Sequence, residues 1–531
     1  MAIPVFIWLS WAAFYYPFAT YGYWQDIWEH AAVINEWMKD LWHPKNPHLP
    51  VDTGSPRYMP YFFLLSSIGR LFDLEALQVL GLGSVLNVAA LLTGIFLFFR
   101  LYFKDEWAPV IGGAIMLGGW GIAWIWPNNY QLRSLFYVSS YPATFAMAMS
   151  LLAFWIAVKL LRDEFRSLWW YVVLVSLVFV IVLSHQPTGS FAIASLFILA
   201  VVEPGVSLAC RGKLAILVLL GTLLAGFWPY FSLWDLVAGT PASIWSAAAP
   251  TDQNWIESSI QAFIVGRGPM NKFYSPIVII MSFAPALLGF PIIIYLAYRK
   301  SQLFIVAGFL VMMTPYIANM IFPIPLGPRY LYFSIFYLHL ALTWSVLTAL
   351  RYGRNSEQQR PPGSSRVLVG MTSSMVVLAF GGNLLLAGLI FAGYHPRMTY
   401  DPPYRVEDIK RYSRIEPVVS DMRKIATYIP VDAVVLGVPW MVWPLPTFKG
   451  KITAVNHANP FILDGGRRKA DALKFFKPTT SHEERSEILQ RYHATHIVYK
   501  QDVTSAPVIA DIDKLGKIVG TVKSLAIVAL Y

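Results

Sequence analysis

Apolar runs long enough to cross a membrane recur along the first 391 residues, separated by short polar segments. A nearly uncharged run of about 18 residues or more is typical of a transmembrane helix, because a helix satisfies its own backbone hydrogen bonds in hydrocarbon. The pattern predicts a polytopic α-helical membrane protein with about eleven spans, at residues 3–20, 76–100, 108–126, 140–160, 168–184, 187–203, 213–234, 274–298, 302–322, 330–350 and 367–391.

Composition supports this fold class. The chain is 56% hydrophobic and only 13% charged, whereas a soluble protein carries about 25% charged residues. The run that follows Met1 has no basic residues before it and no small-residue cleavage site after it, so we expect a retained first span. The single cysteine, Cys210, excludes an intramolecular disulfide framework.

The last part of the chain has the composition of a soluble domain. We predict a transmembrane domain over residues 1–394, with a large first external loop at 21–75, and an α/β domain over 395–531. Helical patterns and β-branched runs alternate there, with helices at 416–428, 467–476 and 482–493 and strands at 433–439, 496–500, 517–522 and 525–531.

Basic residues gather in alternate loops, which predicts the orientation of the chain in the membrane. One set of short loops holds Arg100, Lys104, Lys159, Arg162, Arg166, Arg211, Lys213, Arg299, Lys300, Arg351, Arg354, Arg360 and Arg366. Apart from the first loop, the opposite set holds only Arg133, Arg267, Lys272 and Arg329. The first set, and with it the N-terminus, is therefore expected in the cytoplasm, and the C-terminal domain outside. Cytoplasmic loops and a mildly basic domain explain the net charge of +11, so no nucleic-acid partner is expected.

The stretch from Tyr23 to Arg70 is too polar to cross a bilayer and too rich in aromatic residues to be a slack loop. Helical spacing places Asp26, Glu29 and His30 on one face directly after the first span. Asp26 is the candidate catalytic base, since a carboxylate in aromatic surroundings is suited to deprotonating a hydroxyl. The alternatives are an ordinary helix-start acid and a cluster that ligates a divalent cation.

External arginine and histidine residues form a second group of candidates. Arg57 and Tyr58 lie in the proline-rich segment 55–61, where the guanidinium could hold phosphate oxygens or anchor the loop at the membrane surface. His185 lies between two apolar runs, where it could bind the donor or satisfy helix-end carbonyls, and Arg329 follows another proline-rich turn. Weaker candidates are Arg133, Arg267 and Lys272, and a polar cluster in the C-terminal domain comprising His457, Asp464, Arg467 and Arg468.

These features together resemble the GT-C superfamily of polyprenyl-phosphate-sugar-dependent membrane glycosyltransferases, in particular the lipid A aminoarabinose transferases and protein O-mannosyltransferases. The resemblance is carried by the acid after the first span within Gln25–His30, by Ser55–Tyr61, by the multi-span core and by the external C-terminal domain. It implies that Asp26 acts as catalytic base or positions the acceptor, and that Arg57, His185 and Arg329 hold the lipid phosphate. A second acidic motif and a WWD-like motif are missing, which argues against an oligosaccharyltransferase catalytic subunit.

The resulting hypothesis is an enzyme that moves a sugar from a polyprenyl phosphate to a glycan, lipid or protein hydroxyl at the outer face of the cytoplasmic membrane. Glu29, His30 and Tyr58 would assist substrate binding. A divalent cation is the one cofactor left open. Two alternatives remain: a non-catalytic subunit of a polysaccharide export system, and a secondary transporter. Transporters place ionisable groups near the bilayer midplane and often show duplicated halves, and this sequence has neither feature.

Overall fold

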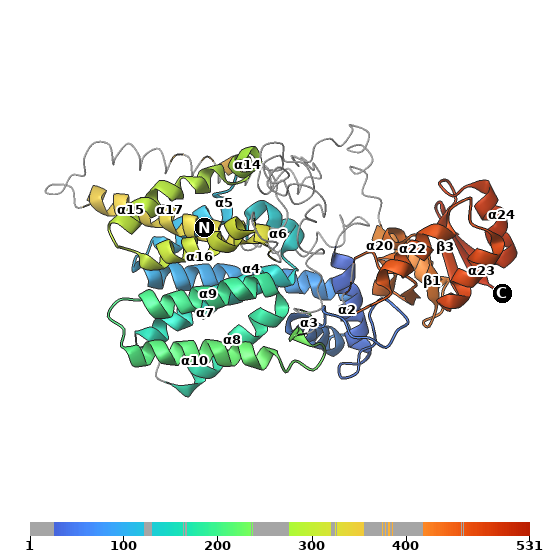
Figure 1. The fold of residues 1–531 in the computed structure, drawn as a ribbon, viewed down its shortest axis with the longest axis horizontal. Helices are drawn as coiled ribbons and strands as arrows, with labels where there is room; N and C mark the ends of the chain where they lie inside the picture. Colours follow the sequence, from blue (N-terminus) through green and yellow to red (C-terminus); the bar gives the residue numbers. More distant parts are fainter. Residues whose placement is uncertain are drawn as a thin grey trace. The chain divides into compact units, whose positions relative to one another are not determined.

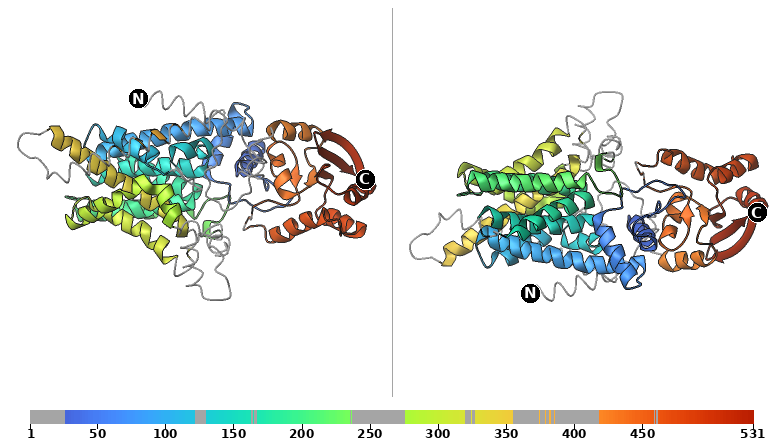
Figure 2. Two further views of the ribbon diagram at one scale, coloured as in Figure 1. Left: turned by 90° about the horizontal axis from the view of Figure 1, so that it is seen from above. Right: turned by 90° about the horizontal axis from the view of Figure 1, so that it is seen from below.

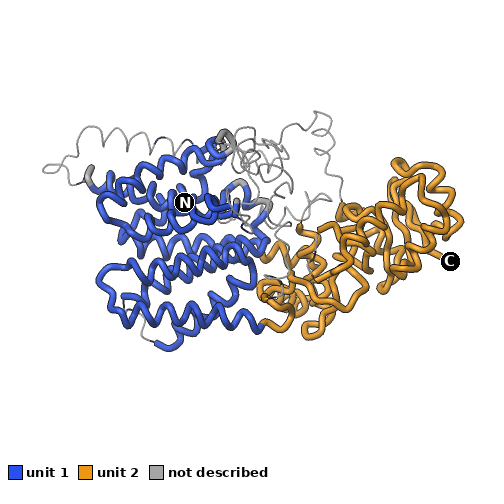
Figure 3. The backbone as a smooth tube through the Cα atoms, viewed as in Figure 1, with its two compact units in different colours: residues 1–13, 84–227, 241–411 blue, residues 14–83, 228–240, 412–531 orange. Residues whose placement is uncertain are grey.

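The computed structural model describes residues 26–121, 130–162, 167–234, 276–319, 327–354 and 418–531, except Ala458 and Pro460, together with a few isolated positions between these ranges. The chain divides into two compact units (Figure 3). Unit 1 comprises residues 1–13, 84–227 and 241–411, and unit 2 comprises residues 14–83, 228–240 and 412–531. The predicted spans at 3–20 and 367–391 lie wholly or mostly outside the described residues, as do Arg267, Lys272 and the side chain of Arg133.

Apolar helices form the described part of unit 1. They are α4 (Ala76–Phe103, whose first turns belong to unit 2), α5 (Ala108–Gly118), α6 (Leu132–Val138), α7 (Pro142–Leu161), α8 (Leu168–Ser184), α9 (Gln186–Val202), α10 (Leu208–Ala225), α14 (Pro276–Leu287), α15 (Gly289–Tyr298), α16 (Leu303–Ala318) and α17 (Tyr330–Arg354), with the 3-10 turn η2 (Gly327–Arg329). Helices α7 to α10 pack side by side, and α16 packs between α9 and α17 (Figures 1 and 2).

Most helices of unit 1 overlap the predicted apolar runs, but α5 ends at Gly118, before the predicted end at 126, and α6 lies between the predicted runs at 108–126 and 140–160. Of the described helices, α4, α7, α10 and residues 330–351 of α17 are long and apolar enough to cross a membrane, and the sharply bent pair formed by 282–298 and 303–318 could add a fifth span. The run predicted as one span at 274–298 forms two helices, α14 and α15. The predicted architecture of several apolar helices is thus confirmed, while the total of eleven spans stays a prediction.

Polar side chains inside unit 1 find partners on neighbouring helices. Ser195 of α9 hydrogen-bonds to Tyr337 of α17 at 2.7 Å, and Ser190 of α9 hydrogen-bonds to Tyr330 at 2.8 Å. Because hydrocarbon offers no hydrogen bonds, such pairs fix two apolar helices against each other.

Unit 2 contains a five-stranded sheet in the order β2-β1-β3-β5-β4. Strand β1 (Val434–Leu436) pairs in parallel with β2 (Lys451–Ile452) and β3 (His496–Lys500), while β5 (Leu525–Leu530) pairs antiparallel with β3 and with β4 (Gly516–Val522). Its helices are α20 (Val418–Thr427), α21 (Pro439–Val442), α22 (Gly465–Phe475), α23 (His482–Arg491) and α24 (Ala506–Leu515), with the 3-10 turn η3 (Leu445–Thr447).

Both faces of this sheet are covered. Ile497 and Tyr499 of β3 pack with residues of α22, α23 and α24 in one core. Val498 points to the opposite face and is also buried, and α20 packs against β4. The predicted helices and strands of the C-terminal domain are confirmed, although β1 is shorter than the predicted 433–439, and β2, α21 and α24 were not predicted. The predicted boundary at residue 394 lies outside the described residues and stays a prediction.

The described part of the first loop, residues 26–75, also belongs to unit 2. Helix α2 (Ile27–Lys39) packs against α3 (Pro60–Leu71), which begins with a proline in its first turn, where a missing N–H costs nothing. Trp37 of α2 contacts the rings of Tyr58 and Tyr230, with centroids 4.6 and 5.1 Å away. The Tyr230 hydroxyl donates to the carbonyl of Leu41. The loop is therefore a packed element with its own aromatic core.

Candidate active site

Asp26 lies at the start of α2, as the helical spacing predicted. The backbone N–H groups of Glu29 and His30 donate to its carbonyl, at 3.0 and 3.2 Å. An aspartate at this position ordinarily accepts a hydrogen bond from the next turn through its side chain, but the side chain of Asp26 makes no such cap. Its carboxylate lies instead beside a side chain from the C-terminal part of the chain.

That side chain is His457, in the segment that follows β2. Its Nδ1 atom lies 3.4 Å from Oδ1 of Asp26 and 3.5 Å from Oε1 of Glu29. The imidazole packs edge-to-face against the indole of Trp443, with ring centroids 4.5 Å apart, and Trp443 is fully buried. A rigid aromatic support therefore directs the histidine to two carboxylates, and its charge depends on protonation.

Arg57 completes the cluster from the segment that precedes α3. Its Nε atom donates to Oε2 of Glu29 at 2.8 Å, so Glu29 lies between the guanidinium and His457. The side chains of Asp26, His457 and Arg57 retain 29, 41 and 31% of their exposure, whereas Glu29 retains 10%. Glu29 is thus the buried centre of the cluster, and the other three groups remain accessible to a substrate.

Two further predicted residues lie behind this cluster. His30 is buried, and its ring packs on Phe62 with centroids 4.8 Å apart. Burial, followed by the nearby Arg57 and His457, holds the pKa of His30 well below its usual value. Tyr58 is also buried, and its hydroxyl donates to the carbonyl of Lys45. Both side chains are part of the loop's packed interior, and their predicted role in substrate binding stays a prediction.

His185 and Arg329 belong to unit 1. His185 caps the start of α9: its Nδ1 lies 2.7 Å from the Thr188 hydroxyl and accepts from the Thr188 N–H. The contact is a cap on an N–H group at a helix start, whereas the alternative to donor binding that the sequence left open was a bond to helix-end carbonyls. Arg329 ends η2 and directly precedes α17, with its side chain half-buried. A contribution of either residue to the site of unit 2 stays a prediction.

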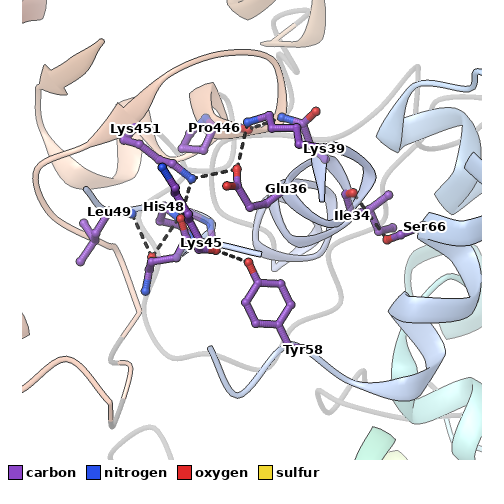
Figure 4. A network of polar contacts seen from close by, with 12 residues as sticks. Ile34, Glu36, Lys39, Lys45, His48, Leu49, Tyr58, Ser66, Pro446 and Lys451 are labelled. Carbon is purple, nitrogen blue, oxygen red and sulfur yellow. Dashed lines mark hydrogen bonds and ion pairs between the residues drawn. The ribbon is translucent and has the colours of Figure 1, made fainter. Parts of the chain in front are cut away.

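A separate set of polar contacts joins α2 and the first loop to the sheet domain (Figure 4). Lys451 of β2 donates to Oε2 of Glu36 at 2.9 Å, and the amide of Asn35 donates to the Pro446 carbonyl. The N–H of Ile452 donates to the carbonyl of His48 at 2.7 Å, so the first loop covers the β2 edge of the sheet. These contacts bring the two ends of the chain together within one unit.

Within the described part of the chain, no group of three or more His, Cys, Asp or Glu residues is placed to hold a metal ion. Asp26, Glu29 and His457 lie together, with Nδ1 of the imidazole 3.4 and 3.5 Å from the two carboxylates. The divalent cation left open by the sequence gains no support from this geometry.

The sequence ranked His457 below the first-loop candidates and did not single out Lys451, Glu36 or Trp443. Aromatic residues before a polar segment, in PWMVWP at 439–444 and VNHANP at 455–460, were the available signal. This pattern indicates a polar turn near buried aromatic residues. It does not indicate which distant carboxylates the turn contacts.

No profile of a known protein family and no curated protein sequence matches the chain. Several solved structures do match its fold. ArnT from Cupriavidus metallidurans in the apo state superposes with a TM-score of 0.52 and 13% identity over 99% of this chain and 97% of that one. The same enzyme bound to undecaprenyl phosphate gives a TM-score of 0.51 at 13% identity, with the same coverage. The apo oligosaccharyltransferase of Archaeoglobus fulgidus gives 0.51 at 12% identity, over 96% of this chain and 71% of that one. The chain therefore has the fold of the GT-C superfamily, as the resemblance implied.

Proposed function

We propose that this chain, a membrane protein with the GT-C fold, is a glycosyltransferase that moves a sugar from a polyprenyl phosphate to an acceptor hydroxyl. The observation that carries the proposal is the convergence of Asp26, Glu29, Arg57 and His457 from opposite ends of the chain. Acid–base groups beside an accessible guanidinium suit a reaction in which a hydroxyl loses a proton and a phosphate leaves.

The donor is a sugar linked to a membrane lipid by a phosphate. Arg57 supplies a guanidinium beside the acid–base groups, and arginine is the side chain best shaped to hold phosphate oxygens. The apolar helices of unit 1 offer a hydrocarbon setting for the lipid chain. The superposition with ArnT bound to undecaprenyl phosphate supports a donor of the same class.

The reaction needs one proton transfer and one displacement. The carboxylate of Asp26 takes the proton of the acceptor hydroxyl, and the oxygen attacks the anomeric carbon of the sugar. The bond between that carbon and the phosphate oxygen breaks, and the polyprenyl phosphate leaves with the electron pair. Arg57 neutralises the charge on the leaving phosphate. His457, 3.4 Å from Asp26, orients the base and can carry the proton onward.

The reaction is placed at the outer face of the cytoplasmic membrane. The support is the distribution of basic residues, which assigns the N-terminus and the Arg- and Lys-rich loops to the cytoplasm. The first loop and the C-terminal domain then share the outer side, together with the acceptor, which is a glycan, a lipid or a protein.

The test is a transfer assay with purified protein in nanodiscs and a panel of polyprenyl-phosphate sugars. D26N should abolish transfer while leaving folding intact, because the amide keeps the shape of the side chain and loses the base. D52N is the matched control, since Asp52 is an exposed acid of the same loop. Wild-type protein that neither binds nor turns over any donor would refute the proposal. A D26N variant that still supports polysaccharide export in cells would identify a non-catalytic subunit, and donor-independent solute uptake would identify a transporter.

A further inference from the structure

Glu36 and Lys451 form a buried ion pair between the first loop and the sheet domain (Figure 4). Their side chains retain 8 and 15% exposure, and Oε2 of Glu36 lies 2.9 Å from Nζ of Lys451. The carboxylate also accepts from Lys39, and Lys451 donates in addition to the carbonyl of Asn46. An ion pair removed from water in this way needs every hydrogen bond it makes, because each lone charge would be costly to bury.

Neighbouring hydrogen bonds to the backbone make the pair part of a larger network between the first loop and β2. The side-chain oxygen of Asn46 accepts from the N–H groups of His48 and Leu49, which fixes the turn that presents the Asn46 carbonyl to Lys451. The carbonyl of His48 in turn accepts from Ile452, the residue after Lys451. Lys451 thus lies where the loop, α2 and β2 meet.

The spacing along each segment relates this pair to the candidate active site. Glu29 and Glu36 are seven residues apart, which is two turns of α2, or about 10.5 Å along one face. The segment 451–457, which begins with β2, carries Lys451 at one end and His457 at the other. It therefore meets α2 at two points: Lys451 on Glu36, and His457 on Asp26 and Glu29.

We propose that Glu36 and Lys451 are positioning residues that hold the 451–457 segment in register on α2, so that His457 reaches Asp26 and Glu29. The expected effect on transfer rests on the proposed function. The expected effect on the position of the 451–457 segment rests on the contacts alone. Both residues lie in the packed contact between α2 and β2, and Glu36 is about two helical turns along α2 from Glu29.

The chain offers a conservative variant and a matched control. K451R keeps a cation able to donate to both Glu36 and Asn46, whereas K451M keeps the length of the side chain and removes the charge. K523M is the control: Lys523 lies 2.8 Å from Asp421, another buried carboxylate of unit 2, on α20. All three substitutions change one lysine beside one buried acid, but the control leaves the contact between α2 and β2 untouched.

The experiment measures hydrogen–deuterium exchange and steady-state transfer on the full-length chain in nanodiscs. K451M should raise exchange in peptides covering 27–39, 45–53 and 451–457, and lower kcat by about a hundredfold with little change in donor KM, because a displaced catalytic group costs rate before binding. K451R should restore most of the protection from exchange and most of kcat. K523M should leave the exchange of these peptides and kcat as in the wild type.

Two results would overturn the inference. One is unchanged exchange in the 451–457 peptide of K451M. The other is a K451M variant with faster exchange whose kcat per folded molecule equals that of the wild type, since the pair would then only stabilise the unit. The exchange measurement needs no substrate, so it stands even if the proposed glycosyl transfer fails in the wild-type protein.

Discussion

Mild acid should loosen the first loop, because His48 is buried in a form that cannot take up a proton. Burial, followed by the charges of Lys451 and Arg57, lowers the pKa of His48 from 6.5 to about 3. In the opened state the imidazole titrates at its ordinary pKa. Between about pH 6.5 and 3 the opened state therefore binds one more proton than the closed state, and stability is lost as the pH falls through this window.

The size of the effect follows from these two pKa values. Each pH unit below 6.5 costs about 1.4 kcal/mol per buried neutral histidine. Between pH 7.5 and 5.5, His48 should lower the free energy of opening by about 1.4 kcal/mol, which is a tenfold loss of protection. His30 adds a loss in the same direction, since its pKa is also lowered by burial.

The assay is hydrogen–deuterium exchange at pH 7.5 and 5.5, corrected for the intrinsic pH dependence of amide exchange. The amides to follow are those of Leu49, which donates to Asn46, and Ile452, which donates to His48. H48N should reduce the acid-induced loss of protection about tenfold. H43N, at a histidine of the same loop whose side chain is 88% exposed, should behave as the wild type. Equal acid sensitivity of H48N and the wild-type protein would refute the reasoning.

Two other predictions concern the phosphate site and the topology. R57K should raise the donor KM about tenfold with a smaller effect on kcat. The reason is that lysine keeps the charge but loses the planar fork of donors with which arginine could bind Glu29 and a phosphate together. An unchanged KM would show that Arg57 does not bind the donor. A reporter that is active only outside the cytoplasm, fused after Tyr531, should be active, and activity of a cytoplasmic reporter there instead would reverse the orientation.

The sequence by itself determined the helical architecture and most of the C-terminal domain. Runs at 168–184 and 330–350 became α8 and α17 almost to the residue, because an apolar run that must bury its backbone in hydrocarbon has no alternative to a helix. HIVYK and LAIVALY became β3 and β5 for a similar local reason, since β-branched residues pack well on a pleated surface. Local spacing also placed Asp26 and Glu29 on one face of α2.

Only the tertiary structure decided what that face meets. Periodicity along a helix shows which side chains lie together, but it does not select the distant surface that packs against them. His457 reaches Asp26 and Glu29 because β2 adds to the sheet beside β1 and the first loop covers its edge, with Lys451 on Glu36. These contacts join residues from opposite ends of the chain, and their partners were chosen by burial and by charge complementarity in the folded unit.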